Sequence, residues 1–289
     1  MSRLREEQKA RLRQAIDDAT RVLTDAKVAS PRIDAEELAA HLAGTSRGRL
    51  MLLDTVSDDF FGRYADLISA RAKRIPLQHL TGTAAFGPLD LAVGPGVFIP
   101  RPETEALLEW ATDQQLPAEP VIVDLCTGSG ALAVALARHQ PAATVIGVDI
   151  SADALAYARR NAAGTSVQLR RGDVRDPTLY DELDGRVDLV VANPPYLPDD
   201  AALEPEVAEH DPADALFGGA DATSFIPPIS VLAGRWLVDG GLLAIEHDDA
   251  AADAVGELLR HTGLFENVIS HNDFAGRPRF VTARRKVAS

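Results

Sequence analysis

The chain has almost no cysteine: Cys126 is the single one among 289 residues. One cysteine excludes an internal disulfide framework and leaves no cysteine cluster for zinc, so we expect a reducing compartment. The chain also lacks an apolar run long enough to span a membrane, and residues 1–20 are rich in charges, without the apolar stretch of a signal peptide. We therefore expect a cytoplasmic protein with no membrane segment and no bound metal.

Basic residues are scarce in the larger part of the chain. Residues 1–85 hold 14 Lys and Arg against 12 Asp and Glu, whereas residues 86–289 hold 15 against 31. A protein that binds nucleic acid needs positive charge against the phosphates, so this balance argues against direct nucleic-acid binding. It is compatible with a protein substrate that carries basic residues. A general role in solubility explains the acidity equally well, and both interpretations stay open.

The first part of the chain is patterned for amphipathic helices. Apolar residues recur at three- and four-residue spacings in residues 6–27, 31–42 and 58–74. The apolar face of the first helix is predicted to hold Leu12, Ile16, Ala19, Leu23 and Ala26. Pro31 suits the first position of the second helix. Because this part has no glycine-rich loop and no acid–base cluster, we predict a helical substrate-recognition domain over residues 1–78.

The pattern changes twice beyond this helical part. Residues 79–102 carry Gly and Pro at short intervals between alternating apolar residues, which predicts a β-hairpin linker. Residues 103–289 then alternate helical stretches with short apolar runs: VIVD, ATVIGVD, VQLRRGD, VDLVVANPPY, GGLLAIEHD, FENVISH and RFVTARR. Strands separated by helices of ordinary length indicate the α/β class, with a sheet covered by helices on both faces.

A glycine turn follows the first of these runs. The strand at residues 121–125 enters Cys126-Thr127-Gly128-Ser129-Gly130, and a helix follows. Glycines at these positions let a ligand approach the backbone closely. Ala133 replaces the third glycine of the GxGxxG dinucleotide pattern, a substitution that dinucleotide folds tolerate. The loop is therefore predicted to bind a nucleotide-like ligand, and a plain tight turn is the alternative.

Two further acids end predicted strands. Asp149 ends the second run and could accept hydrogen bonds from both hydroxyls of a ribose. Its alternative role is a helix N-cap, which Ser151 or Asp153 could fill instead. Asp173 ends the third run and could accept from an adenine amino group, with Val174 packed on the ring. A turn aspartate explains Asp173 nearly as well.

The fourth run leads directly into Asn193-Pro194-Pro195-Tyr196. Two prolines cannot continue a sheet, so the chain leaves it in a stiff extended form just outside the carboxyl end of the strand, where ligands bind in such sheets. The side-chain oxygen of Asn193 and the carbonyl of Pro194 can each accept one hydrogen of a planar NH2 group. They would orient its nitrogen toward a methyl donor and stabilise the developing charge, while Tyr196 packs on the flat face.

Together these motifs resemble the release-factor glutamine methyltransferase family (PrmC/HemK-like), across nearly the whole chain. The matching segments are FIPRPETE (98–105), DLCTGSG (124–130), Asp149, NPPY (193–196) and EVAEHDPADALFGG (206–219). The resemblance implies a seven-stranded, Rossmann-like class I S-adenosylmethionine methyltransferase sheet with an N-terminal helical bundle and a β-hairpin linker. It also implies methylation of the side-chain nitrogen N5 of the glutamine in the Gly-Gly-Gln motif of class I peptide-chain release factors. S-adenosylmethionine would become S-adenosylhomocysteine, and we expect a monomer.

The residues and the resemblance together give a candidate site. Cofactor contacts are expected at Asp124, Cys126, Thr127, Gly128, Ser129, Gly130, Asp149, Asp173, Val174 and Asn193. Substrate contacts are expected at Arg101, Glu103, Asn193, Pro194, Pro195 and Tyr196, with Asn193, Pro194 and Tyr196 acting in the transfer. Cys126 stands where the family usually has glycine, and Val174 where some members have an aromatic ring. These two departures bear on cofactor affinity and leave the reaction unchanged.

Two other functions compete with this interpretation. An adenine-N6 methyltransferase of DNA or RNA would also satisfy NPPY, because the exocyclic amine is a planar NH2 group, but the acidic balance weighs against it. A non-catalytic cofactor-binding regulator would be expected to lack Asn193, which is present. His210 and His247 have no metal-ligand spacing and are interpreted as polar loop or strand-end residues. Trp110 and Trp236 are interpreted as packing residues.

Overall fold

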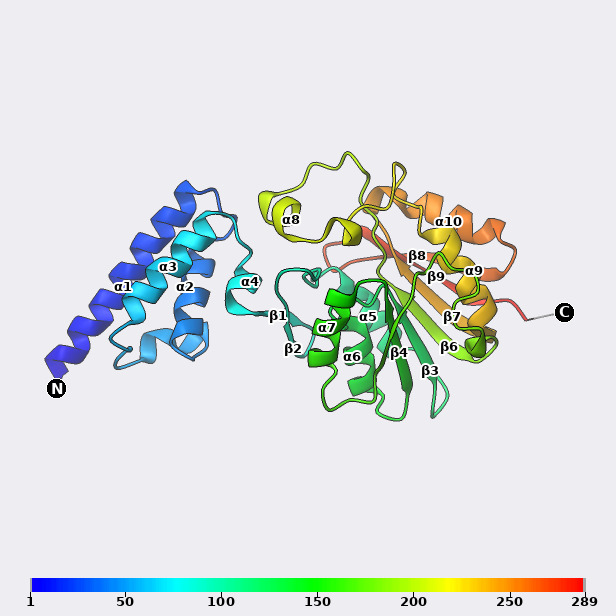
Figure 1. Ribbon diagram of the computed structural model, residues 1–289, viewed down its shortest axis with the longest axis horizontal. Coiled ribbons are helices and arrows are strands. Elements are labelled where there is room, and N and C mark those ends of the chain that lie inside the picture. The colour runs from blue at the N-terminus through cyan, green and yellow to red at the C-terminus, as the bar shows by residue number, and fades with distance from the viewer. Residues whose placement is uncertain (1, 288–289) are drawn as a thin grey trace. The chain divides into compact units, whose positions relative to one another are not determined.

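The computed structural model describes residues 2–287, with side chains from residue 6 onward, and the chain divides into two units. Unit 1 contains the residues up to Thr83 together with Glu204–His210, and unit 2 contains Ala84–Leu203 and the residues from Asp211 onward. Figure 1 shows the elements of each unit in chain order, from blue to red. A short segment from the second half of the sequence thus belongs to the N-terminal unit.

Unit 1 is helical. Its elements are α1 (Ser2–Asp25), α2 (Pro31–Leu42), the 3-10 helix η1 (Arg47–Leu52), α3 (Phe60–Ala72), α4 (Leu77–Thr81) and α8 (Pro205–His210). The predicted apolar face of α1 is confirmed, since the four residues from Leu12 to Leu23 are buried and Ala26 is partly buried. The second helix starts at Pro31, as predicted. The first ends at Asp25, two residues early, because Lys27 adopts a left-handed backbone with φ of 58°.

Ion pairs attach α8 to the rest of unit 1. Arg71 donates from Nε to Asp34 at 2.7 Å and from an Nη to Glu206 at 2.8 Å, while Arg74 Nε donates to the same carboxylate of Glu206 at 2.7 Å. Burial alone would raise the pKa of Glu206, but hydrogen bonds from Arg74 and Arg71 hold it at about 2. The carboxylate therefore stays charged at neutral pH and keeps α8 with the N-terminal helices.

Unit 2 carries the hairpin and the sheet. The hairpin is formed by β1 (Thr83–Phe86) and β2 (Leu89–Ala92). The other strands are β3 (Val121–Leu125), β4 (Thr144–Asp149), β5 (Gln168–Arg171), β6 (Val187–Ala192), β7 (Leu237–Glu246), β8 (Phe265–Asn272) and β9 (Pro278–Arg285). The helices are α5 (Thr104–Thr112), α6 (Ala131–His139), α7 (Ala152–Asn161), α9 (Ile226–Trp236) and α10 (Ala252–His261), with 3-10 turns η2 (Asp181–Leu183), η3 (Ala213–Ala215) and η4 (Asp249–Ala251).

The seven strands predicted from the apolar runs form one sheet, in the order β5-β4-β3-β6-β7-β9-β8. The neighbours from β5 to β7 are parallel, and β9 runs antiparallel to both β7 and β8. The strand order reverses between β3 and β6, and in such sheets ligands bind beyond the carboxyl ends of the strands at this reversal. The predicted mixed α/β class with a seven-stranded sheet is confirmed.

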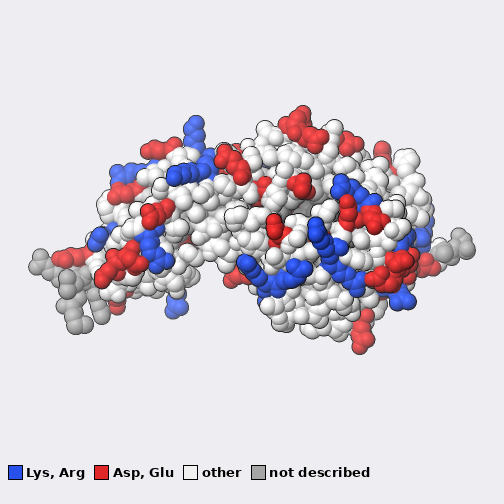
Figure 2. All heavy atoms as spheres, viewed as in Figure 1, with Lys and Arg blue, Asp and Glu red and all other residues white. Residues whose placement is uncertain are grey.

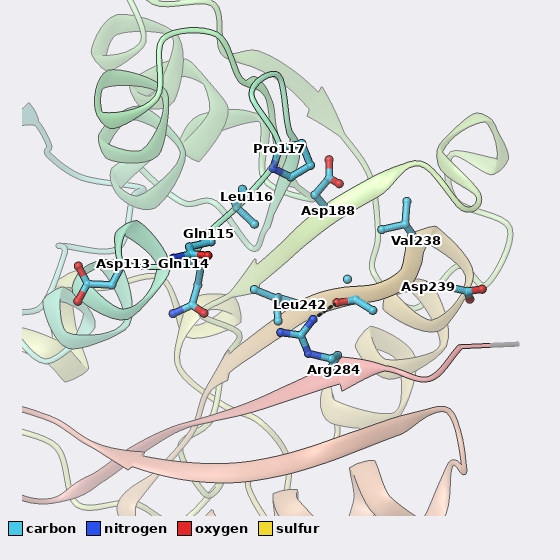
Figure 3. Close-up of a pocket in the computed structure, with 12 residues that line it drawn as sticks. Asp113, Gln114, Gln115, Leu116, Pro117, Asp188, Val238, Asp239, Leu242 and Arg284 are labelled. Carbon is cyan, nitrogen blue, oxygen red and sulfur yellow. Dashed lines mark hydrogen bonds between the residues drawn. The ribbon is translucent and has the colours of Figure 1, made fainter.

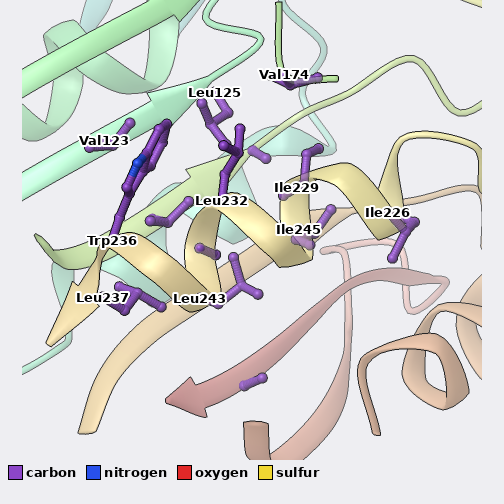
Figure 4. Packing of buried hydrophobic residues seen from close by; sticks show 14 of the residues in the cluster. Val123, Leu125, Val174, Ile226, Ile229, Leu232, Trp236, Leu237, Leu243 and Ile245 are labelled. Atoms are coloured by element: carbon purple, nitrogen blue, oxygen red, sulfur yellow. The ribbon is translucent and has the colours of Figure 1, made fainter. Parts of the chain in front are cut away.

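Two apolar layers hold the sheet between its helices. One layer packs α9 against β3, β6 and β7, with Trp236 fully buried between Val123, Leu232 and Leu237 (Figure 4). The other layer packs α5 and α6 on the opposite face, and partly buried Trp110 belongs to it. Both tryptophans are packing residues, as predicted. No helix among residues 2–287 is long and apolar enough to cross a membrane.

Candidate active site

The turn after β3 is the candidate cofactor loop, residues 126–130. Cys126, Gly128 and Gly130 all have positive φ, at 59°, 56° and 82°. A Cβ added at Gly128 would meet no atom within 4 Å, so the loop is open on that side. A Cβ added at Gly130 would lie 3.3 Å from the Cβ of Ala158 in α7, so the helix packs closely there. The loop therefore exposes backbone at Gly128 and packs tightly at Gly130.

Cys126 occupies a backbone conformation that suits glycine. Its left-handed φ costs a residue with a Cβ roughly 1–2 kcal/mol, which gives a physical reason for the glycine expected at this position from the resemblance. Burial, followed by the carboxylates of Asp149, Asp124 and Asp173, raises the pKa of the thiol well above its ordinary value. The thiol therefore stays protonated and is a poor nucleophile. The neighbouring side chains of Thr127 and Ser129 are buried.

The carboxyl group of Asp124 lies within the protein beside the loop and is only 1% exposed. It accepts a hydrogen bond from the Thr127 hydroxyl at 2.5 Å and another from the N–H of Ala133, in the first turn of α6, at 3.1 Å. Burial outweighs these bonds and raises the pKa of Asp124 to about 7. These contacts make Asp124 a support for the loop and the helix. A direct contact with a cofactor stays a prediction.

Asp149 lies at the carboxyl end of β4, next to the loop. One carboxylate oxygen accepts from the N–H of Gly128 at 2.8 Å and the other from the N–H of Ser151 at 2.9 Å. Ser151 caps α7, because its hydroxyl accepts from the N–H of Ala154 at 3.2 Å, so Asp149 is not the cap. Burial raises the pKa of Asp149. The carboxylate is thus held in a defined orientation beside the open backbone, as a ribose acceptor would require.

The third strand end is arranged differently. The carboxylate of Asp173 pairs with the guanidinium of Arg175 at 2.9 Å, and this pairing lowers the pKa of Asp173. Val174 is 6% exposed and belongs to the apolar layer under α9. The predicted contacts of these two residues with adenine are not tested by this arrangement. Compared with Asp149, Asp173 has a more exposed side chain and a strong competing partner.

Asn193 to Tyr196 leave the sheet directly after β6, with both prolines buried. The side-chain Nδ2 of Asn193 donates to the hydroxyl of Thr104, in the first turn of α5, at 3.1 Å. The hydroxyl of Tyr196 donates to Glu246, at the end of β7, at 2.9 Å. Burial and the Glu246 carboxyl raise the pKa of Tyr196 well above its ordinary value, so the phenol stays neutral. The two polar side chains of the tetrapeptide are therefore anchored on neighbouring elements.

The LFGG part of the following segment lies directly against this tetrapeptide. Leu197 donates its N–H to the carbonyl of Leu216 and accepts from the N–H of Gly218, both at 2.8 Å. A Cβ added at Gly218 would lie 2.6 Å from the carbonyl oxygen of Pro195 and 2.9 Å from the Cα of Tyr196. Only glycine therefore fits at position 218 without moving the backbone of NPPY.

Arg101 and Glu103 flank the start of α5. The guanidinium of Arg101 forms an ion pair with Asp211, which is buried, and also lies over the ring of Phe98 at 4.9 Å. The pair joins the IPRP segment to the acid of the EHDP segment, so Arg101 has a structural partner that its sequence context did not reveal. Glu103 is the residue before the first turn of α5 and acts electrostatically on Tyr196 and Glu246.

Two residues of this site were not assigned a role from the sequence: Thr104 and Glu246. Thr104 lies in the quoted PETE segment, and Glu246 precedes His247, which drew attention instead. A signal for Glu246 was available, because it is an acid at the carboxyl end of a buried strand, like Asp149. Nothing in the local sequence pairs it with Tyr196, which is fifty residues away in the chain.

The histidines considered as bases or ligands have other surroundings. His247 is fully buried, its Nδ1 lies 2.8 Å from the carbonyl of Asp248, and burial lowers its pKa. His210, in unit 1, stacks edge-to-face with His79 at 6.1 Å between ring centroids. In the described part of the chain, no three His, Cys, Asp or Glu side chains gather as a metal site would require.

A pocket of about 300 Å³ lies elsewhere in unit 2 (Figure 3). Its lining includes Pro117 before β3, Asp188 at the start of β6, Val238 at the start of β7, and Arg284. These positions lie at the amino ends of the parallel strands, whereas ligands in such sheets bind at the carboxyl ends. The Arg284 guanidinium donates to the carbonyl of Gly240 at 2.8 Å. We therefore assign the active site to the edge that carries the glycine loop and NPPY.

Two known domain families match consecutive parts of the chain. The PrmC N-terminal domain matches residues 14–82, and the methyltransferase small domain matches residues 84–210. The second match includes the glycine loop, Asp149 and NPPY, so the segments singled out above lie within a known methyltransferase domain.

Similar proteins agree with these matches. A release factor glutamine methyltransferase from Mycobacterium tuberculosis is 62% identical over 278 residues, covering 95% of this chain and 91% of that protein. A 4-amino-L-phenylalanine/4-methylamino-L-phenylalanine methyltransferase from Streptomyces pristinaespiralis is 40% identical over 270 residues, covering 90% of each. A solved methyltransferase structure from Pyrococcus furiosus aligns with a TM-score of 0.51 at 16% identity, covering 76% of this chain and 99% of that one. That last likeness concerns the fold alone.

Proposed function

Because this chain belongs to the release factor glutamine methyltransferase family, we propose that it methylates the side-chain amide nitrogen of the glutamine in the Gly-Gly-Gln motif of class I release factors. The methyl donor is S-adenosylmethionine, which when bound supplies an electrophilic methyl group on a sulfonium. The observation that carries the proposal is the anchoring of Asn193 beyond the carboxyl end of β6, beside the glycine loop. The acceptor nitrogen gains the methyl carbon and releases one proton.

The residues at this edge fit the donor. The open backbone at Gly128 leaves space for a ligand, and the oriented carboxylate of Asp149 provides acceptors for the two ribose hydroxyls. Asn193 and the carbonyl of Pro194 would accept the two hydrogens of the glutamine NH2 group, and Tyr196 would pack on its plane. An amide nitrogen is a weak nucleophile because its lone pair is delocalised, so these acceptors favour the transition state in which positive charge develops there.

The direct test is mass spectrometry of a purified class I release factor after incubation with the enzyme and S-adenosylmethionine. We expect one added methyl group on the glutamine of the Gly-Gly-Gln peptide, and none when that glutamine is replaced. Asn193→Ala should lower kcat by about 10²–10³-fold while cofactor affinity is largely kept. Asn272→Ala, an exposed position on β8, is the matched control. Near-normal turnover of Asn193→Ala would remove NPPY from the mechanism.

Adenine-N6 methylation remains the alternative function, because an exocyclic adenine amine offers the same planar NH2 group. Residues 86–289 hold 31 acidic against 15 basic residues, and Figure 2 shows both signs interspersed over the face in view. Such a surface does not favour binding to a phosphate backbone. Methylation of DNA or RNA oligonucleotides at a rate comparable to that of the release factor would favour the alternative.

We further propose that the helical domain, residues 1–78, docks the folded release factor. A Gly-Gly-Gln loop offers few contacts, since its glycines lack side chains and ordering them costs backbone entropy, so binding energy must come from elsewhere. Deleting residues 1–75 should raise KM for intact release factor sharply and affect a short Gly-Gly-Gln peptide much less. Equal losses on both substrates would contradict docking. A monomeric enzyme acting in the cytoplasm, where release factors work, completes the proposal.

A further inference from the structure

Behind the tetrapeptide lies a buried polar chain that the proposed reaction has not yet used. Asn193 Nδ2 donates to Thr104, and Tyr196 donates to Glu246. The hydroxyl of Thr104 also hydrogen-bonds Glu246 and favours the ionised form of its carboxyl. The three elements involved are the chain after β6, the first turn of α5 and the end of β7. One carboxyl group thus connects both polar side chains of NPPY.

We infer that Thr104 and Glu246 are positioning residues, which turn the oxygen of the Asn193 side-chain amide toward the substrate. This inference rests on the proposed function, because it assigns the direction of a hydrogen bond that the methyl acceptor requires. The two ends of an asparagine amide have nearly the same shape, so its orientation is decided by the donors and acceptors around it. Here the decisive partner is the hydroxyl of Thr104.

The direction of each bond follows from the charge of Glu246. An ionised carboxylate only accepts hydrogen bonds, so Thr104 must donate its single hydrogen to Glu246. The Thr104 oxygen is then left as an acceptor for Asn193 and selects the Nδ2 end of the amide. The Oδ1 end is therefore free to accept an N–H of the substrate. Glu246 accepts the hydrogen of Tyr196 in the same way and fixes the position of that ring.

Protonation of Glu246 would remove this selection. A neutral carboxyl can donate to Thr104, whose own hydrogen could then bond Asn193 Oδ1 and present the NH2 end of the amide to the substrate. Two donors would then face each other, and an unpaired donor in a closed site is costly. The reaction should therefore slow as Glu246 takes up a proton.

The surroundings of Glu246 make this protonation relevant near neutral pH. The residue is 0% exposed, and burial raises its pKa to about 7, against the lowering effects of Thr104, Tyr196 and Arg279. The charged or titratable groups that act on it are Tyr196 after β6, Glu103 before α5 and Arg279 on β9. The adjacent His247 is buried with a lowered pKa, so it adds no charge at neutral pH.

The experiment measures kcat, KM and cofactor affinity of full-length variants on intact release factor between about pH 6 and pH 9. In the wild-type enzyme, kcat should fall as pH decreases through about 7. Glu246→Gln should lower kcat at pH 8 by about 10- to 100-fold, keep cofactor affinity, and lose the acid limb of the profile. Glu266→Gln, on the exposed edge of β8, should match the wild type.

Thr104 gives a second, independent comparison. Thr104→Ser keeps the hydroxyl and should stay within a few-fold of wild-type kcat, whereas Thr104→Val should lose about 10- to 100-fold. Thr112→Val, at the other end of α5, controls for the loss of a helix hydroxyl. If Glu246→Gln fails to fold, the Thr104 pair and the wild-type profile decide alone.

The outcomes separate this inference from the proposed function. An active wild-type enzyme that depends on Asn193, together with wild-type-like kcat and pH profiles in Glu246→Gln and Thr104→Val, would overturn the positioning role alone. An inactive wild-type enzyme on every class I release factor would overturn the proposed function first. A purely structural role of Glu246 is also distinguishable, because it would lower melting temperature without changing the shape of the pH profile of kcat.

Discussion

The two units bury ionisable side chains in opposite ways. In unit 1, Asp34 and Arg71 are 6% and 5% exposed and pair with each other at 2.7 Å. In unit 2, Asp124 and Glu246 are at most 1% exposed and are bonded mainly by hydroxyl groups. Burial raises the pKa of both unit 2 acids to about 7.

The difference separates charge that holds a fold from charge that is available for function. A buried ion pair keeps both partners ionised and contributes chiefly to geometry. A buried carboxyl without a cation in direct contact titrates near neutral pH, and such groups are concentrated at functional sites. The unit with the ion pair is the one without chemical motifs, and the unit with the perturbed acids carries the glycine loop and NPPY.

Breaking the ion pair of unit 1 should have the largest effect. Arg71→Met leaves the carboxylate of Asp34 buried without its cation, which typically costs about 3–5 kcal/mol of folding free energy. Urea denaturation should show this loss, whereas Arg63→Met, which breaks an exposed pair with Asp59, should cost at most about 1 kcal/mol. A loss below about 1 kcal/mol for Arg71→Met would mean that the pair contributes little to the fold.

The next effect concerns the cofactor edge of unit 2. Asp149→Ala should weaken S-adenosylmethionine binding by roughly 1.5–3 kcal/mol for each charge-assisted bond lost. The variant also frees the N–H groups of Gly128 and Ser151, so loop order should decrease as well. Titration calorimetry measures the affinity, with the exposed Asp153→Ala as the control. Unchanged affinity in Asp149→Ala would remove this residue from the cofactor site.

A smaller effect is expected where the chain approaches NPPY most closely. Gly218→Ala places a Cβ 2.6 Å from the Pro195 carbonyl, and the strain of about 1–3 kcal/mol should displace the tetrapeptide. We expect kcat to fall about 10-fold or more with cofactor affinity kept. Gly62→Ala in α3, where an added Cβ meets no atom within 4 Å, should leave kcat unchanged. Equal activity of the two variants would show that this contact does not position NPPY.

The pH dependence of stability sharpens the same comparison. The pKa of Asp124 is raised from about 3.9 in the unfolded chain to about 7 in the folded one, so the folded state binds more protons in this window. Its contribution is present below the unfolded pKa and is lost as pH rises toward about 7. Wild type should therefore lose about 1 kcal/mol relative to Asp124→Asn between pH 6 and pH 7. Parallel stability curves for the two proteins would contradict the raised pKa.

Periodic patterns were sufficient for the elements of both units. The spacing of Leu12, Ile16 and Leu23 predicted a buried helix face, and seven apolar runs predicted seven strands, because burial on one side imposes these periods locally. The short helix α4 was not predicted, since five residues carry too little periodicity. The rule that ligands bind at carboxyl ends of parallel strands then sufficed to bring the glycine loop, Asp149 and NPPY to one edge.

What only the tertiary structure decided is which distant side chains meet. Glu206 bonds Arg71 across 135 positions of sequence, Asn193 bonds Thr104 across 89, and Tyr196 bonds Glu246 across 50. No local period encodes such pairs, because each depends on how strands are ordered and how loops return to them. The amino-acid sequence by itself determined the elements, their class and the motif residues. The packing of those elements decided the partners that orient Asn193, the raised pKa values of the buried acids and the unit to which α8 belongs.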